Sequence, residues 1–274
     1  MSNEIKSQHY VPRFVLRFFG DRENVNKAWE LNLHTNRICL KSIEKLCAQN
    51  NLYEIRDEEG NFIFPNGRNK LEKGLAKIES DYSVYFNELF LEIPRMNTHF
   101  ILKEGLRESL CTWVTLLFLR NPLAKYLYPE VSKELLDIEI KEEKDKAYNF
   151  IDLMVILWVP LAKKLAERKL LFLVTDEDNP FVITDIPFYV FDQNFPENLF
   201  LPLSSTIAVQ FTEKLLPFEN PDYCVVKALD SNTVWEWNVN MYCVIEGALQ
   251  NNVPIGTSVI ASKREVLEDL QYVV

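Results

Sequence analysis

The sequence predicts an α+β fold, in which a helical middle region packs on a mostly antiparallel sheet. Apolar residues recur at three- and four-residue spacing through much of residues 68–169, which is the period of helices. Residues 170–274 instead hold short β-branched or aromatic runs bounded by Asp, Asn and Pro, as strands do. Strands and helices do not alternate, so a doubly wound parallel sheet fits less well. We expect a single domain over residues 1–274, in which residues 1–67 form an N-terminal hairpin and loop region.

The N-terminal region is predicted to hold a short helix and a hairpin. Pro12 favours the first position of a helix, because its missing N–H would be unpaired there, and Gly20 favours the end of that helix. Residues 25–33 and 36–40 indicate two strands joined by His34-Thr35. We expect this hairpin to join the sheet of the C-terminal part.

The remaining elements are predicted from their periodicity and their boundaries. After a turn-rich excursion over residues 57–67, three long helices are expected: one along the apolar stripe of residues 71–89, one over residues 101–121, and one over residues 130–168 that Pro160 interrupts. Strands are expected at residues 170–175, 181–184, 207–212, 223–228 and 258–261, with a helix around residues 232–250.

The composition indicates a folded protein and argues against some classes of binding protein. Hydrophobic residues make up 47% and charged residues 26%, the balance of an ordinary folded chain. The formal net charge of −10 argues against a protein that coats DNA or an anionic membrane, although a local basic groove is compatible with it. The five cysteines form no Cys-x-x-Cys pair and are odd in number, so we expect buried, reduced thiols.

The ends and apolar runs of the sequence predict a cytoplasmic protein. The first ten residues contain no apolar stretch of the kind that signal peptides carry. The longest apolar run, residues 153–162, is too short to span a bilayer. We therefore expect no membrane partner.

The densest group of polar residues is the segment Gln8-His9-Tyr10-Val11-Pro12-Arg13-Phe14. If Pro12 begins a helix, His9 lies just before it and Arg13 lies in its first turn. An imidazole and a guanidinium placed there suit an anion such as a phosphate. The alternative is structural: His9 caps the helix or pairs with a buried carboxylate.

Several motifs resemble a large bacterial family catalogued as domain of unknown function 4238. They begin with Gln-His-Tyr-Val-Pro-Arg-Phe and, in order along the chain, continue with Leu71-Glu72, Ile78-Glu79-Ser80, Arg120-Asn121-Pro122, Pro180-Phe-Val-Ile-Thr-Asp185, Leu201-Pro-Leu-Ser204 and Asn238-Val-Asn240. The family usually has Thr-Ser-Asp-Asn-Pro where this chain has Thr184-Asp185-Ile186-Pro187. The resemblance implies a shared fold and pocket, and no particular activity.

Three carboxylates in these motifs are candidate metal ligands. Glu72 and Glu79 are seven residues apart and so lie on one helical face, while Asp185 ends a predicted strand. Oxygen ligands of this kind suit Mg²⁺ or Mn²⁺, which could assist phosphodiester hydrolysis.

Two other arrangements of the motif residues remain open. In a metal-free site, His9 acts as general base while Arg13 and Arg120 hold a phosphate. In a structural network, the same two arginines pair with Glu79 and Asp185 and fix the helix packing. We predict that His9, Arg13, Arg120 and Asp185 converge in the fold, although they are far apart in sequence.

These candidates lead to two hypotheses on function. In the first, the protein is a phosphodiester-cleaving hydrolase, a nuclease-like effector that acts on nucleic acid or a nucleotide at a local site; by analogy with scattered bacterial families, phage defence is the expected context. The second is a non-catalytic sensor or ligand-binding module braced by a salt-bridge network. An open cleft around the motif residues favours the enzyme, and a dry, fully paired cluster favours the scaffold.

Overall fold

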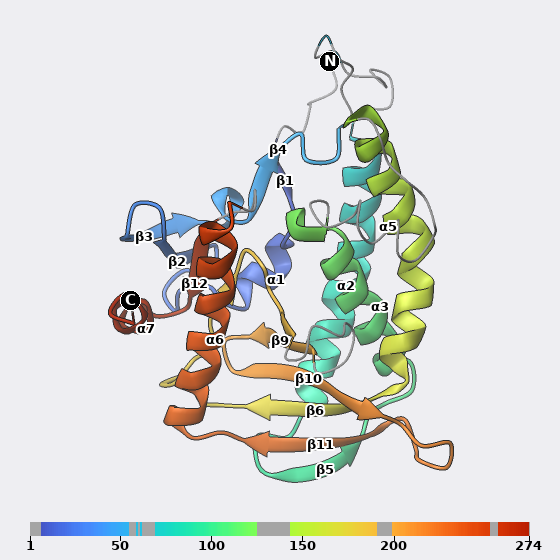
Figure 1. Cartoon of the computed structure of the whole chain (residues 1–274). Helices are drawn as coiled ribbons and strands as arrows, with labels where there is room; N and C mark the ends of the chain where they lie inside the picture. The colour runs from blue at the N-terminus through green and yellow to red at the C-terminus, as the bar shows by residue number, and fades with distance from the viewer. Residues whose placement is uncertain are drawn as a thin grey trace.

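The computed structural model describes residues 7–54, 59, 61, 69–124, 143–190, 199–252 and 257–273. Apart from residues 59 and 61, the predicted excursion over residues 57–67 lies outside this range, as does the start of the predicted third helix, residues 130–142. The described chain has the predicted α+β architecture, with long helices and three separate sheets (Figure 1).

The largest sheet has six strands. Their spatial order is β5 (Thr98–Ile101), β11 (Tyr223–Ala228), β6 (Arg168–Val174), β10 (Ile207–Lys214), β9 (Leu199–Ser204) and β8 (Tyr189–Val190). All neighbours pair antiparallel except β11 and β6, which are parallel. The mostly antiparallel sheet expected from the C-terminal part is therefore present. Strands β5, β8 and β9 were not predicted from the sequence. β9 is buried on both faces, so it lacks the alternation that marks a half-buried strand.

A second sheet carries the N-terminal hairpin. Its order is β3 (Arg37–Ser42), β2 (Lys27–Asn32), β12 (Ser258–Ala261) and β7 (Ile183–Thr184), with every pair antiparallel. The hairpin does join strands of the C-terminal part, but in a sheet distinct from the six-stranded one. A third, two-stranded sheet pairs β1 (Ser7–His9) with β4 (Ala48–Asn50). Both strands are short and polar, so periodicity could not reveal them.

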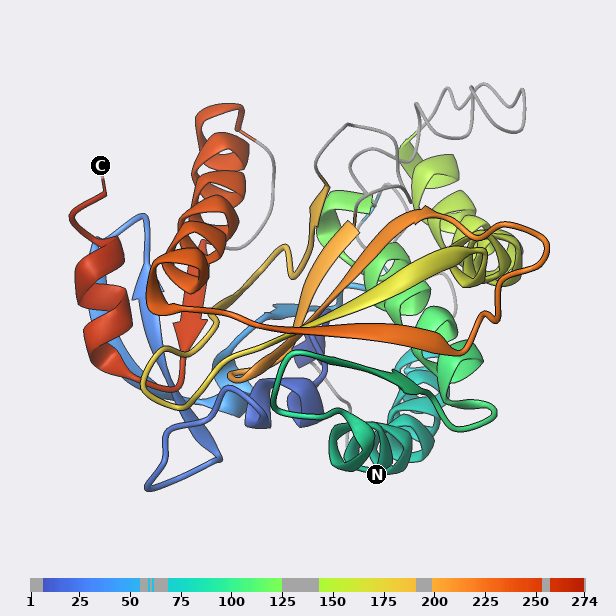
Figure 2. The same cartoon turned by 90° about the horizontal axis from the view of Figure 1, so that it is seen from below.

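The helices lie on two sides of the six-stranded sheet (Figures 1 and 2). On one side are α2 (Lys70–Glu92), α3 (Leu106–Leu119) and α5 (Glu143–Ala166); on the other are α6 (Ser231–Gln250) and α7 (Arg264–Leu270). The predicted short helix is present as α1 (Arg13–Arg17), but Pro12 is its N-cap rather than its first residue, and it ends before Gly20. The 3₁₀ helix η1 (Ile43–Lys45) precedes β4. No helix in the described part combines the length and the apolar character that a membrane crossing needs.

Two helix predictions need correction. The helix predicted from residue 101 begins only at Leu106, after Gly105 in a left-handed conformation (φ 82°), because residues 98–101 form β5. Pro160 does not interrupt its helix, and α5 runs through it. Its ring faces solvent, while neighbouring Leu157 is buried and the Trp158 indole N–H donates to the carbonyl of Thr112 at 2.8 Å, so packing on α3 holds the helix across the proline.

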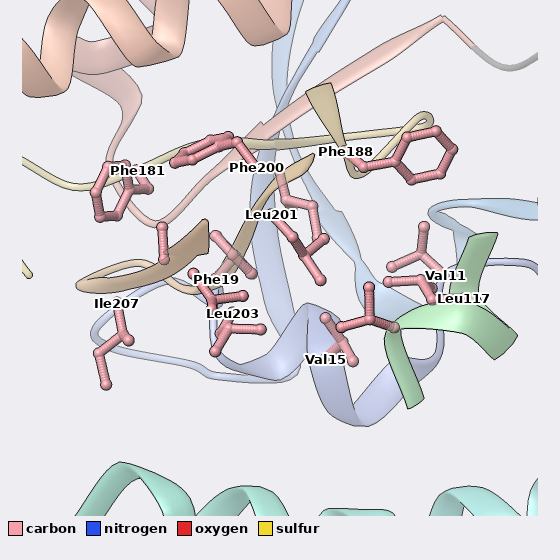
Figure 3. Close-up of a cluster of buried hydrophobic side chains, with 14 of the residues drawn as sticks. Val11, Val15, Phe19, Leu117, Phe181, Phe188, Phe200, Leu201, Leu203 and Ile207 are labelled. Carbon is pink, nitrogen blue, oxygen red and sulfur yellow. The ribbon is translucent and has the colours of Figure 1, made fainter. Parts of the chain in front are cut away.

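The core fixes the N-terminal motif between the helices and the main sheet. Figure 3 shows α1 and its flanks facing buried residues of β9, β10 and the end of α3. Ten of these fully or nearly fully buried side chains are Val11, Val15, Phe19, Leu117, Phe181, Phe188, Phe200, Leu201, Leu203 and Ile207. Each such burial contributes about 1.5–3 kcal/mol, so α1 is held by packing rather than by its own five residues.

The cysteines are free thiols, as predicted. Cys47, Cys111 and Cys224 are buried, but Cys39 and Cys243 are exposed, so the expectation of burial is wrong for these two. Cys39 lies on β3, at the edge of its sheet, and Cys243 lies on the outer face of α6.

The buried Asn238 of α6 anchors the segment that leads into β7. Its side-chain oxygen accepts a hydrogen bond from the Val182 N–H at 2.9 Å, and its side-chain nitrogen donates to the carbonyl of Pro180 at 2.9 Å. This amide therefore satisfies two backbone groups that have no strand partner.

We predict that Asn238→Ala lowers the free energy of unfolding by about 2–4 kcal/mol, because it leaves two buried backbone groups unpaired. Asn240→Ala is the matched control: this residue is partly buried on the same helix, and its side chain has no hydrogen bond in the described structure. Urea denaturation of both variants measures the difference. Equal midpoints would contradict the anchoring role.

Candidate functional site

The fold brings the predicted motifs together where three elements end. His9 ends β1, Arg120 follows the last residue of α3, and Asp185 follows β7. The Arg120 guanidinium donates to the carbonyl of His9, and the Asn121 side chain donates to the carbonyl of Asp185 at 2.7 Å. These contacts join chain segments that are more than sixty residues apart.

Arg120 is the centre of this arrangement, and each of its three guanidinium nitrogens has a hydrogen-bond partner. Its side chain is 0% exposed, and besides His9 it donates to the hydroxyl of Tyr53 at 3.1 Å and to Glu79 Oε1 at 2.6 Å. A guanidinium closed off from solvent in this way cannot reach a bound phosphate. Arg120 and Glu79 therefore match the structural network predicted for them, and the phosphate-holding role predicted for Arg120 does not fit.

Asp185 is also fully paired, but with neutral donors. Its carboxylate is almost wholly buried and accepts hydrogen bonds from the Tyr10 hydroxyl and, at 2.5 Å, from the Ser258 N–H. The Cys47 thiol is a further partner. Burial raises the pKa of Asp185, while these hydrogen bonds oppose the rise. The predicted pairing of Asp185 with an arginine is not made, because β7 pairs with β12 and so places this carboxylate against the Ser258 backbone.

His9 keeps one polar atom free. The imidazole is largely buried and hydrogen-bonds the backbone of Ile43, yet its Nε2 is buried with no hydrogen-bond partner in the described chain. The backbone bond must therefore use Nδ1, which leaves the lone pair on Nε2. Burial, reinforced by the charge of Arg13, lowers the pKa of His9 to about 4. His9 is thus neutral near pH 7 and can accept a proton or a hydrogen bond.

Glu72 is the second group with a free polar atom. It lies on α2, two turns before Glu79, and its Oε2 is buried with no partner among the described residues. Burial raises the pKa of Glu72 to about 7, and the charge of Glu79 adds to the rise while Arg120 and Arg13 oppose it. This carboxyl group is therefore able to give or take a proton near neutral pH.

The same two arginines influence the pKa of both residues. The charges of Arg13 and Arg120 act on both His9 and Glu72. The Arg13 side chain is 53% exposed, and its ion pair with Glu44, at 3.9 Å, is on the surface. Because α1 has only five residues, an anion here would be held by this side chain rather than by the helix end.

The candidate site thus has two layers. His9 and Glu72 each have one buried polar atom without a partner among the described residues, and Arg13 is exposed, whereas Arg120, Glu79 and Asp185 hold the backbone in place. Glu72 was predicted as a metal ligand, and Tyr10 and Tyr53 were not predicted as the partners of Asp185 and Arg120. Tyr10 lies inside the first motif, so its position was a usable signal; Tyr53 had none.

The predicted three-carboxylate metal site does not fit these contacts. Glu79 is committed to Arg120, and Asp185 to Tyr10 and Ser258. Within the described ranges, no three or more His, Cys, Asp or Glu side chains form a group that could hold a metal ion.

Together, the fold and this site define an α+β protein whose motif residues gather around one buried arginine. Residues 7–245 match the model of a family described as "Protein of unknown function (DUF4238)". The chain belongs to this family, as its motifs predicted, and the match extends from β1 into α6. No curated protein and no solved structure matches the chain.

Glu72 and Glu79 of α2 give opposite predictions for stability. Between pH 4.5, the ordinary pKa of this carboxyl, and about 7, folded Glu72 keeps a proton that the unfolded chain releases, so the free energy of unfolding falls as pH rises. Glu72→Gln removes this loss and should stabilise the protein at pH 8 by about 1–3 kcal/mol, with no gain below pH 4.5.

Glu79→Gln is the matched control on the same helical face. It leaves the buried Arg120 charge without its partner and should destabilise the fold by about 3–5 kcal/mol. Denaturant unfolding of both variants at pH 8 and pH 4 tests the pair. A loss of stability in Glu72→Gln at pH 8 would show that Glu72 is a bracing residue like Glu79.

Proposed function

We propose that the protein is a phosphodiester-cleaving hydrolase that uses His9 and Glu72 for acid–base catalysis and Arg13 to hold the phosphate. The observation that supports the proposal is that His9 Nε2 and Glu72 Oε2 are buried without a hydrogen-bond partner in the described chain, while the charge of the exposed Arg13 acts on both residues. Buried polar atoms in folded proteins nearly always have hydrogen-bond partners. Two buried atoms without partners, on residues whose pKa values respond to the same arginines, are compatible with a site that binds a ligand.

The proposed roles follow from the protonation states. Neutral His9 accepts the proton of the attacking hydroxyl at Nε2, and protonated Glu72 donates a proton to the leaving oxygen. Arg13 contacts the non-bridging phosphoryl oxygens, where charge grows in the transition state. Arg120 and Tyr53 do not touch the substrate; they fix the backbone at His9.

In the cell, the protein acts as a nuclease-like effector on nucleic acid or a nucleotide at a local site. The net charge of −10 means that attraction depends on Arg13 rather than on the whole surface. A role in phage defence is part of the proposal. Comparing plaque formation on cells that carry the wild type and His9→Ala checks it.

A ligand-binding module is the second candidate. It is favoured because the polar groups of Arg120 and Asp185 have partners within the protein. These contacts make the region rigid but supply no reactive group. In that case the site binds an anionic ligand through Arg13, and His9 serves only as a hydrogen-bond acceptor. Ligand binding without turnover would distinguish this module from the hydrolase.

We predict a bell-shaped pH dependence of cleavage. The rate should rise as pH passes about 4, where His9 becomes neutral, and fall as pH passes about 7, where Glu72 loses its proton. Glu72→Gln should lower kcat about 10²–10⁴-fold and remove the fall at high pH. Rates on a labelled oligonucleotide over this pH range provide the measurement.

The control for this prediction is His34→Ala, which removes an exposed imidazole in the β2–β3 turn. It should leave the profile unchanged, while His9→Ala should abolish turnover with folding intact. Wild-type rates in His9→Ala would rule out the proposed base.

A further inference from the structure

We infer that a cavity between α6 and α7 binds an aliphatic diamine or polyamine, through two carboxylates of α7 and an indole ring of α6. The cavity has a volume of about 500 Å³, which is in the usual range of small-molecule sites. The two helices lie side by side (Figures 1 and 2). The inference does not rest on the proposed hydrolase, because His9, Glu72 and Arg13 do not line this cavity.

Two family motifs meet in the wall of the cavity. Pro180 begins one motif and Asn238 begins another, and both residues line the cavity. The Asn238 side chain is 3% exposed, and in the described chain its amide bonds the Val182 N–H and the Pro180 carbonyl. A side-chain amide has two donor and two acceptor positions, so one of each remains for a ligand. This wall is therefore rigid and keeps some hydrogen-bonding capacity.

The charge of the wall favours a cation. Three carboxylates and one ammonium group line the cavity, which gives a formal net charge of −2. The ammonium group belongs to Lys263 and is paired with Asp178 at 3.0 Å. Glu265 and Asp269 are exposed, and their carboxylates have no ion pair or hydrogen bond in the described chain. A phosphate or carboxylate ligand would be repelled here.

The N-terminal end of α6, which would otherwise attract an anion, is already capped. The Asp230 carboxylate accepts a hydrogen bond from the Thr233 N–H at 2.8 Å. Asp230 also adds a negative charge next to Ser231, a residue of the cavity wall. The helix end therefore does not reverse the preference for a cation.

The spacing of the free carboxylates favours a ligand with two positive charges. Glu265 and Asp269 are four residues apart on α7, so they lie on one face with Cβ atoms about 5–6 Å apart. Like charges at this spacing repel each other, and each is stabilised by a counter-charge of its own. A short aliphatic chain with an ammonium group at each end supplies both counter-charges.

Trp235 offers a surface for the aliphatic part of such a ligand. It is half-buried in α6, and in the described chain its indole neither stacks on another ring nor donates a hydrogen bond. An aromatic face attracts ammonium groups and packs against the methylene groups that carry them. Val234 and Val266 add apolar contacts to the same wall.

The test is isothermal titration calorimetry of the full chain with putrescine and spermidine at low salt. Butylamine, which has a single ammonium group as a lysine side chain does, and Mg²⁺ are the comparison ligands. We expect saturable binding of putrescine and spermidine and weaker binding of both comparison ligands. Added salt should weaken the binding, because it screens exposed charges.

Matched variants locate the binding. The double variant Glu265→Gln, Asp269→Asn should weaken spermidine binding about 10-fold, and Trp235→Leu about 2–5-fold. Glu268→Gln is the control, because it removes a charge from α7 at a residue that pairs with Arg264 and does not line the cavity. It should bind spermidine as the wild type does. Thermal unfolding without ligand checks that each variant is folded.

Four results would overturn the inference. They are wild-type affinity in the double variant, an equal loss in Glu268→Gln, equal or tighter binding of butylamine or Mg²⁺, and no binding of either putrescine or spermidine at millimolar concentration. Each of them leaves the proposed hydrolase untouched, since its residues lie outside the cavity.

Discussion

The burial of one guanidinium organises this protein. Arg120 lies where α3 ends. It donates hydrogen bonds to the carbonyl of His9 at the end of β1, to the hydroxyl of Tyr53 and to the carboxylate of Glu79 on α2. An unpaired charge in this position would cost several kcal/mol, so the three neighbours cannot move independently of it. The N-terminal motif is therefore fixed relative to α2. The charge of Arg120 acts on both His9 and Glu72.

Some polar groups of the motif residues have hydrogen-bond partners, and others have none among the described residues. Asp185 and Ser258 are paired with each other, whereas the partly buried Glu72 has one carboxylate oxygen, Oε2, without a partner in the described chain, and burial raises its pKa. Natural proteins retain such costs mainly where function needs them. The contrast between Glu72 and Glu79, two similar residues on one helix face, therefore says more about function than either residue alone.

The sequence predicted much of this fold, because long helices and the β2–β3 hairpin carry strong local signals. It could not predict β1 or β9, since one is too short for a pattern and the other is buried on both faces. The motif positions were identified, but their partners were not. Nothing local to Arg120 indicates that Tyr53 and the carbonyl of His9 surround it, and nothing local to Asp185 indicates three neutral donors in place of an arginine.

The long separations between contacting residues bear on how the protein is made. Tyr10 meets Asp185 across 175 residues, and Glu30 meets Ser258 across 228. A ribosome-bound chain that has exposed only its N-terminal motif cannot form these contacts, and loop closure over such distances is slow. The site therefore matures only after β12 has left the ribosome. Until then Asp185 lacks its partner Ser258, so the nascent chain carries the motif residues without the assembled site.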